Sequence, residues 1–449
     1  MGGMRVIVIG AGEVGQHIAR TLSAERHDVT VVDRDANRVA GLQGDLDALV
    51  MEGNGASPKF LADIGAARAD LLCAVTQSDE ANVIAALAAD RLGTGRTVAR
   101  VRDDDYFGAD QEFSRDVLGI DFVINPERAT AGDLAEAILL PGAVHVQYFA
   151  EGRIAVAESI LTSRSPLVGA NIGDRRMVRP NYILGMIRDG RPFAAEPHDR
   201  GKLGDHVLVA AARDDIRAVV AHLAGQAQKV RDVIVFGAGR VGLPLTRRLE
   251  ADGDLRVTLM ERDPARARYV AERVGKATVL IEEGVQRDTL LAQGVDRAGA
   301  FVACAGDDRA NLLAAMHAKR LGAGLCLAVV SREEFTPLVD ALNIDAAFSP
   351  RLVTAEAILR AARGRNVHAM YLLVGGAEVL KVQVDEGSEA DGWTVEHTSI
   401  RVRARVAMLV REGRVHIPKR DDRVRGGDRL LLFSTGRGIA DVRSTFTAA

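Results

Sequence analysis

A six-residue glycine pattern occurs twice in this chain, and it limits the possible folds more than any other feature. Gly10–Gly15 reads Gly-Ala-Gly-Glu-Val-Gly, and Gly237–Gly242 reads Gly-Ala-Gly-Arg-Val-Gly. Each copy follows a short apolar run, and an acidic residue, Asp33 or Glu261, ends the next apolar run. A strand, a glycine turn, a helix, a second strand and an acid in this order are typical of a dinucleotide-binding α/β unit. The sequence therefore predicts two such units.

The repeat continues beyond the glycines. The sequence Ala-Glu-Ala-Ile-Leu stands at residues 135–139 and again at 355–359. Short apolar strands alternate with helical patterns, which predicts an α/β fold with two Rossmann-like, doubly wound parallel-sheet domains. Shorter strands and turns after each unit predict a small α+β domain. The predicted domains are residues 1–140, 141–225, 230–365 and 366–449, with a linker at 225–229.

The first glycine pattern predicts a phosphate-binding loop. Gly10 permits a tight turn after the strand, Gly12 lets the backbone approach a pyrophosphate, and Gly15 allows close helix–strand packing. A helix that starts near Gly12 directs its free N–H groups at the phosphates. Asp33 is predicted to accept the ribose hydroxyls and to favour NAD(H) over NADP(H), whereas Arg34 weakens this preference or stacks on the adenine. The loop comprises Gly10, Ala11, Gly12, Glu13, Val14 and Gly15.

Further candidates follow the third, fourth and fifth predicted strands, where ligands of open α/β sheets bind. Thr76, Gln77 and Ser78 are expected to hydrogen-bond a ribose or a phosphate, and Ser78 alternatively caps the next helix. Arg100 either faces the diphosphate or is a solvated residue at a strand end. Gly53 and Asn54 are expected to line the adenine site.

The second pattern keeps its glycines but changes its charges. Glu261 replaces Asp33, Arg240 replaces Glu13, and the position of Arg100 falls at Val329 or Val330. Arg240 would favour additional phosphate charge. The second copy is predicted either to bind a nucleotide or to be a degenerate copy kept for dimer geometry. Its candidate residues are Gly237, Ala238, Gly239, Arg240, Val241, Gly242 and Glu261.

Composition and motifs restrict the function. The formal net charge is −3, so no basic field predicts a nucleic-acid partner. Cys73, Cys304 and Cys326 lie in apolar runs and are predicted to be reduced core residues. No apolar run approaches the length of about 18 residues that a membrane span requires. The alternating run Arg401–Arg405 is predicted to be a solvated strand face.

No catalytic constellation accompanies the two patterns. The chain lacks a Tyr-x-x-x-Lys pair, a Walker-type lysine after the glycines and a Cys/His group with metal spacing. Binding without evident chemistry predicts a sensor, not an enzyme, with no catalytic residue and no metal site. An NAD-dependent oxidoreductase and a redox-sensing transcriptional regulator are the alternatives, and no helix-turn-helix pattern supports the latter.

These residues resemble the TrkA family of potassium-uptake regulatory subunits, which have two RCK (TrkA-N) domains, each followed by a TrkA-C domain. The resemblance covers essentially the whole chain. It is carried by Gly10–Gly15, Val31–Asp33, Gly53–Pro58, Ala74–Asn82, Ala99–Arg102 and Asn125–Glu127. The chain departs from the family pattern at Glu282–Asp288, where a Gly-Asp-Ala-type turn is common, and at Asn54, where many RCK domains carry an acid.

The resemblance implies a cytosolic protein, peripheral on the inner face of the cell membrane, that regulates a TrkH-type potassium-translocating subunit. It implies a homo-oligomer, from a dimer to a ring-like tetramer, whose shape changes with bound nucleotide. NAD(H) is the expected ligand, and some members of the family bind ATP or ADP. The implied contacts are the loop Gly10–Val14, Asp33, Thr76, Gln77 and Arg100, with Gly237–Val241 and Glu261 in the second domain.

Overall fold

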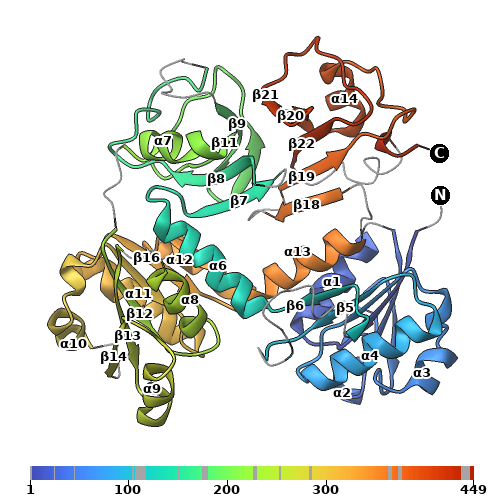
Figure 1. The fold of residues 1–449 in the computed structure, drawn as a ribbon, viewed down its shortest axis with the longest axis horizontal. Coiled ribbons are helices and arrows are strands. Elements are labelled where there is room, and N and C mark those ends of the chain that lie inside the picture. Colours follow the sequence, from blue (N-terminus) through green and yellow to red (C-terminus); the bar gives the residue numbers. More distant parts are fainter. Residues whose placement is uncertain are drawn as a thin grey trace. The chain divides into compact units, whose positions relative to one another are not determined.

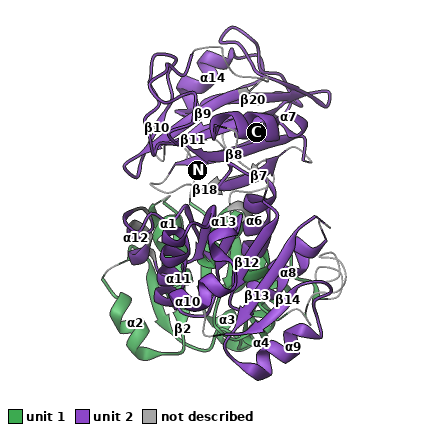
Figure 2. Ribbon diagram, turned by 90° about the vertical axis from the view of Figure 1, so that its left-hand side faces the viewer, with its two compact units in different colours: residues 1–129, 350–365 green, residues 130–349, 366–449 purple. Residues whose placement is uncertain are grey.

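The chain forms two compact units in the computed structural model, each containing one parallel sheet (Figures 1 and 2). Residues 1–129 and 350–365 make the first unit, and residues 130–349 and 366–449 make the second. The structure describes residues 3–24, 26–44, 46–103, 106, 118–149, 152–173, 181–225, 230–251, 254–282, 286–362, 367–372, 377–435 and 445–448.

The first unit contains a six-stranded parallel sheet with strand order β3-β2-β1-β4-β5-β6. The central strands are buried along nearly their whole length, because helices cover both faces of a doubly wound sheet. The strand order reverses between β1 and β4, and ligands of such sheets bind at the carboxyl ends of the strands there. The strands are β1 (Arg5–Ile9), β2 (Asp28–Asp33), β3 (Leu49–Glu52), β4 (Leu71–Ala74), β5 (Thr97–Arg100) and β6 (Phe122–Ile124).

Helix α1 (Glu13–Ala24) follows the first glycine pattern. It buries Val14, Ile18 and Leu22 against the sheet, because residues spaced by three and four positions share one face of a helix. The other helices described in this domain are α2 (Ala36–Leu42), α3 (Pro58–Asp63), the 3-10 turn η1 (Ala66–Arg68) and α4 (Asp79–Leu92).

The second unit repeats this architecture. Its parallel sheet has the order β14-β13-β12-β15-β16-β17, so the prediction of two Rossmann-like domains is confirmed. The strands are β12 (Asp232–Phe236), β13 (Arg256–Glu261), β14 (Thr278–Ile281), β15 (Ala300–Ala303), β16 (Leu325–Val329) and β17 (Ala346–Phe348). The helices are α8 (Gly242–Glu250), α9 (Pro264–Ala271), α10 (Arg287–Ala292), η3 (Val295–Arg297), α11 (Asp308–Leu321), η4 (Glu333–Phe335) and α12 (Thr336–Ala341).

Two antiparallel five-stranded sheets, with orders β10-β9-β11-β8-β7 and β18-β19-β22-β20-β21, form the small domains. Each carries a helix, which confirms the predicted α+β class. Residues 226–229 of the predicted linker lie outside the described residues. The first small domain has β7 (His145–Phe149), β8 (Ile154–Ile160), β9 (Asn181–Arg188), β10 (Arg191–Ala194), β11 (His206–Ala212) and α7 (Arg213–Leu223). The second has β18 (Val367–Leu372), β19 (Glu378–Gln383), α14 (Val395–Val402), β20 (Arg405–Arg411), β21 (Arg414–His416) and β22 (Arg429–Ser434).

The two small domains share one apolar core. Phe149 and Leu208 of the first domain belong to the same buried cluster as Val379, Met408 and Phe433 of the second. The prediction for Arg401–Arg405 is wrong in part, because α14 continues to Val402 and a left-handed residue, Arg403 (φ 52°), ends it. Only Arg405 enters a strand, and its guanidinium contacts the carbonyl of Ala195 and the carboxylate of Glu196.

Each small domain is also held by an equivalent ion pair at a Gly-Asp turn. Arg188 donates through Nε and Nη2 to the two oxygens of Asp205, at 2.8 and 2.7 Å. Arg411 donates in the same way to Asp428, at 2.8 and 2.6 Å. Both aspartates are almost fully buried, so the paired guanidinium compensates a charge that would otherwise be costly to bury.

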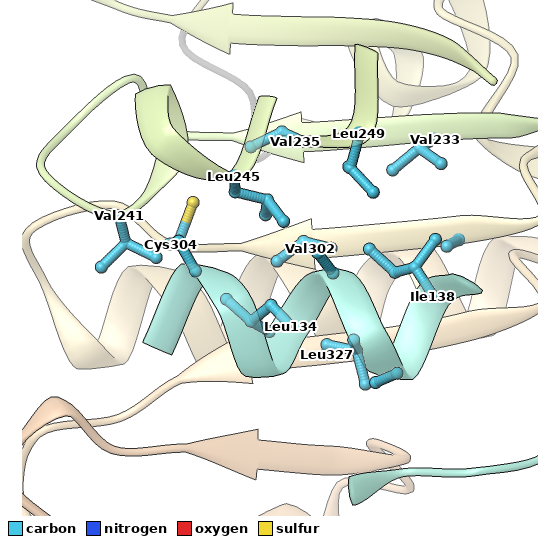
Figure 3. Packing of buried hydrophobic residues seen from close by; sticks show 14 of the residues in the cluster. Leu134, Ile138, Val233, Val235, Val241, Leu245, Leu249, Val302, Cys304 and Leu327 are labelled. Atoms are coloured by element: carbon cyan, nitrogen blue, oxygen red, sulfur yellow. The ribbon is translucent and has the colours of Figure 1, made fainter. Parts of the chain in front are cut away.

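Two helices pack on a domain other than the one they follow in sequence. Helix α6 (Pro126–Leu139) follows the last strand of the first sheet, yet its apolar side chains from Ala131 to Ile138 lie in the core of the second domain. Leu134 and Ile138 pack there with residues of β12, β15 and α8 (Figure 3). Helix α13 (Pro350–Ala362) follows β17 and packs against α1 of the first domain. The two compact units therefore do not coincide with the four predicted domains, because each unit contains a helix from the neighbouring segment. The predicted domain boundaries stay a prediction.

The three cysteines are free and buried, as predicted. Burial raises the pKa of Cys304 and of Cys326 to about 12 and raises that of Cys73 further, so these thiols are protonated at neutral pH. No helix among the described residues combines the length and the apolar character that crossing a bilayer requires.

Leu134→Ala is expected to destabilise the second domain, because it removes a fully buried side chain of α6 from that core. Truncating a buried leucine costs about 2–5 kcal/mol of unfolding free energy. Urea unfolding monitored by circular dichroism measures the change. The matched control is Arg128→Ala on the exposed side of the same helix, which should lie within about 0.5 kcal/mol of wild type. An equal effect of both variants would contradict the assigned packing.

Candidate functional site

The two glycine loops have the same backbone geometry. Gly10 and Gly237 adopt left-handed conformations, with φ of 111° and 102°, which side chains other than hydrogen rarely allow. A Cβ on Gly15 would lie 1.8 Å from the carbonyl oxygen of Gly10, and one on Gly242 would lie 1.9 Å from that of Gly237. A Cβ on Gly12, in contrast, would meet nothing within 4 Å. The open side of the loop is therefore at Gly12, the position expected to approach a phosphate.

Asp33 ends β2 and lies directly against this loop. Its Oδ2 accepts a hydrogen bond from the N–H of Ala11 at 2.7 Å, and its Oδ1 accepts one from the N–H of Asp35 at 2.9 Å. The carboxylate is nearly buried, and each oxygen retains a second acceptor site. Asp33 is thus fixed in one orientation while it can still accept hydrogen bonds from a hydroxyl pair.

Glu261 reproduces this arrangement in the second loop. Its Oε2 accepts from the N–H of Ala238 at 3.0 Å, and its Oε1 accepts from the N–H of Asp263 at 3.0 Å. The additional methylene of glutamate therefore changes neither the loop contact nor the contact with the following turn. Arg240 is exposed, and Val241 is buried at the start of α8.

An arginine in the first turn of the next helix was not identified from the sequence. Arg38 lies 3.7 Å from Asp33 and 3.6 Å from Asp35, from Nη1 and Nε respectively. In the second site, Arg266 Nε instead donates to the carbonyl of Ala238 at 2.9 Å. The shared position of the two arginines, five residues after each acid, is the only sequence feature that would have singled them out.

An asparagine joins the ends of two strands at each site, and this role was also missed. Asn82 Nδ2 donates to the carbonyls of Thr76 and Arg100 at 3.1 and 2.8 Å. Asn311 makes the same bonds to Ala305 and Val329, at 3.0 and 2.9 Å. The equivalent of Arg100 is therefore Val329. Both asparagines are fully buried, and the repeated spacing Asp-x-x-Asn was their sequence signal.

The segment after β4 is held mainly by its own hydrogen bonds. The hydroxyl of Thr76 donates to Asn82 Oδ1 at 2.7 Å, and that of Ser78 accepts from the N–H of Ala81 at 3.1 Å. Ser78 is the N-cap of α4, so its capping role is confirmed. The carbonyl of Gln77 accepts a hydrogen bond from Arg102.

Arg100 is mostly buried and lies 3.5 Å from Glu127, in the first turn of α6. It is therefore not a solvated strand-end residue. Burial lowers the pKa of Arg100, and the charge of Glu127 opposes this shift. Arg100 Nε and Glu127 Oε2 are both buried without a hydrogen-bond partner among the described residues. Unsatisfied charged atoms at the carboxyl edge of a parallel sheet are suited to a polar ligand.

The remaining candidates lie around β2 and β3. Arg34 is exposed at the end of β2. Gly53 donates its N–H to the carbonyl of Asp33 at 2.9 Å, and a Cβ there would collide with the ring of Phe60. Asn54 accepts the N–H of Ala56 at 3.0 Å and so stabilises the turn. The corresponding residues 283–285 of the second site lie outside the described residues. Within the described ranges, no group of His, Cys, Asp and Glu has the geometry of a metal site.

Comparisons with known proteins agree with this architecture. The family model of the TrkA-N domain matches residues 6–126 and 233–350. Trk system potassium uptake protein TrkA homolog 1 from Methanosarcina mazei is 30% identical over 451 residues, which cover 99% of this chain and 100% of that protein.

Two solved structures share the fold. The GsuK channel bound to NAD has a TM-score of 0.65 at 18% identity, over 99% of this chain and 79% of that one. GsuK bound to ADP has a TM-score of 0.52 at 15% identity, over 81% of this chain and 69% of that one.

Gly15→Ala and Gly12→Ala are expected to differ in their effect on stability. The methyl group of Gly15→Ala would overlap the carbonyl of Gly10, so this variant should lose about 1–3 kcal/mol of stability. Gly12→Ala adds its methyl to open space and should stay within about 0.5 kcal/mol of wild type. Thermal unfolding of the two variants measures the difference. Equal melting temperatures would contradict the assigned loop geometry.

Proposed function

The chain belongs to the TrkA family of Trk system potassium uptake proteins, and we propose that it binds nucleotide in the cytosol and thereby gates a membrane-embedded potassium-translocating subunit. The observation that carries the proposal is the repeated contact between a strand-end carboxylate and the glycine loop. Ala11 donates to Asp33 and Ala238 donates to Glu261. Each contact places an oriented carboxylate beside the open amides of a phosphate-binding turn.

NAD(H) is the proposed ligand of the first site. The diphosphate would lie at the N-terminus of α1 above Gly12, and the adenosine ribose would donate its hydroxyls to Asp33. A 2′-phosphate would be repelled by this carboxylate, which disfavours NADP(H). The NAD-bound GsuK structure supports this assignment, and the ADP-bound one supports an adenine nucleotide as the alternative. Arg100, with its unsatisfied Nε, would be a buried cation available to the ligand's polar groups.

The second site is proposed to bind a nucleotide as well. Glu261 keeps both amide contacts of Asp33, which argues against a degenerate copy. Val329 in place of Arg100 removes one cation, whereas Arg240 in place of Glu13 adds one at the loop. The two sites therefore differ in where positive charge would meet a ligand, and they are proposed to differ in nucleotide preference.

The proposed action is regulatory and not catalytic. Nucleotide would stabilise one arrangement of the α/β domains in a homo-oligomer, and this arrangement would bias the open or closed state of a TrkH-type subunit. The protein would reside in the cytoplasm, peripheral on the inner face of the membrane through this partner. The relative's name supports a role in potassium uptake.

Asp33→Asn is expected to weaken binding at the first site about 10- to 100-fold, because it removes a charge-assisted acceptor for the ribose hydroxyls. It also places an amide beside the N–H of Ala11. Isothermal titration calorimetry of the full chain with NADH, NAD⁺, ADP and ATP measures the effect. One of the two binding sites per chain should show this weaker affinity, and the other should be unchanged.

The matched control is Asp28→Asn, which makes the same change at the exposed start of the same strand. It should bind as wild type does. Nucleotide binding by Asp33→Asn at the wild-type affinity and stoichiometry would show that Asp33 is not the ribose acceptor.

Potassium transport provides the second test. In proteoliposomes containing the potassium-translocating subunit and this protein, the nucleotide that binds should change the rate of ion uptake. The Asp33→Asn variant should remove most of that response while leaving nucleotide-independent transport in place. NADH consumption in the same vesicles, without any change in uptake, would instead favour an oxidoreductase.

A further inference from the structure

An ion pair connects the first glycine loop to helix α13, which follows the second sheet in sequence. Arg351 Nη1 lies 3.1 Å from Oε2 of Glu13. Glu13 is the first residue of α1 and stands within the loop, and Arg351 is in the first turn of α13. Both residues belong to the first compact unit.

The position of Arg351 is unfavourable by itself, whereas Glu13 stands in the first turn of α1, where the helix dipole stabilises a carboxylate. A cation at the start of a helix faces the positive end of the helix dipole, so Arg351 does not stabilise α13. A carboxylate beside a phosphate-binding turn repels the phosphate, so Glu13 does not favour an anionic ligand. The ion pair explains the position of Arg351, because the carboxylate of Glu13 neutralises its charge.

The two partners differ greatly in exposure. The side chain of Arg351 is 11% exposed, and that of Glu13 is 61% exposed. Arg351 is held by the buried face of α13, where Thr354, Ala355 and Ile358 are fully buried. A mostly buried guanidinium needs an anionic partner, whereas the exposed Glu13 can rotate into solvent at little cost.

We propose that Arg351 is a specificity-determining residue of the first site, which exchanges Glu13 for the diphosphate of the bound nucleotide. The inference rests on the proposed function, because it requires a phosphate at the loop. The exchange would strengthen binding with each additional negative charge on the ligand. It would also make the start of α13 part of the binding site, so that ligand charge acts on the segment that directly follows β17 of the second domain.

The second loop lacks this arrangement. Arg240 stands at the position of Glu13, so a phosphate there meets a cation without displacing a carboxylate. A dependence of affinity on ligand charge that arises from displacement of a carboxylate is therefore expected at the first site and not at the second.

The test measures how binding depends on ligand charge. Adenosine, AMP and ADP are titrated by calorimetry into the full chain carrying Glu261→Gln. This parent variant lacks the carboxylate of the second site, so the measured binding is mainly that of the first site. Introducing Arg351→Gln should weaken ADP binding about 10-fold or more and adenosine binding less than about 2-fold. Arg351→Lys should restore most of the ADP affinity, and Glu13→Gln should increase that affinity about 3-fold because a repulsive charge is lost.

Arg20→Gln on the exposed side of α1 is the matched control for the loss of one positive charge, and it should change ADP binding less than about 2-fold. The double variant Glu13→Gln/Arg351→Gln avoids an unpaired carboxylate, and thermal unfolding confirms that it is folded. It should bind ADP more weakly than Glu13→Gln alone.

Three results would overturn the inference. Equal weakening of adenosine and ADP by Arg351→Gln would assign Arg351 a purely structural role, and an unchanged ADP affinity would assign it none. Either result leaves the proposed function intact, because the parent chain still binds nucleotide. Failure of the parent and wild-type chains to bind any nucleotide would remove the proposed function and this inference together.

Discussion

Helices α6 and α13 each bury apolar side chains in a domain other than the one they follow in sequence, and this burial links the fold to the two sites. Helix α6 places Leu134 and Ile138 in the core of the second domain, and α13 packs on α1 of the first. A helix of this length is marginal by itself, and its stability comes from the apolar face that it buries. Because each helix starts beside one glycine loop or strand end, the same burial that holds the fold also positions charged residues at the sites.

Those charged residues are held in pairs. The first turn of α6 brings Glu127 to Arg100, and the first turn of α13 brings Arg351 to Glu13. A buried guanidinium without an anion is energetically costly. In each pair the carboxylate neutralises an arginine that could also interact with a bound ligand. Unsatisfied atoms on Arg100 and Glu127 show that the first pair leaves part of its hydrogen-bonding capacity unused.

The two α/β domains share the contacts that shape the backbone of the site, and they differ in the charged residues around it. Contacts that shape the backbone are the same in both copies: the close glycine approach, the acid–amide bond and the asparagine between β4 and β5 or β15 and β16. Residues that carry charge differ, with Glu13 against Arg240 and Arg100 against Val329. Two copies of one backbone geometry that carry different charges are suited to binding different nucleotides.

The two sheets, their helices, the tight turn at Gly10 and the close packing at Gly15 could all be predicted from the sequence, because apolar periodicity and glycine conformation are local properties of the chain. The sequence also placed Asp33 and Glu261 at equivalent strand ends. Three features emerge only from the tertiary packing: the core that α6 and α13 each join, the burial of Arg100 against Glu127, and the contact of Arg351 with Glu13. These contacts join residues far apart in the chain, or residues whose neighbours depend on packing, and no local pattern specifies such partners.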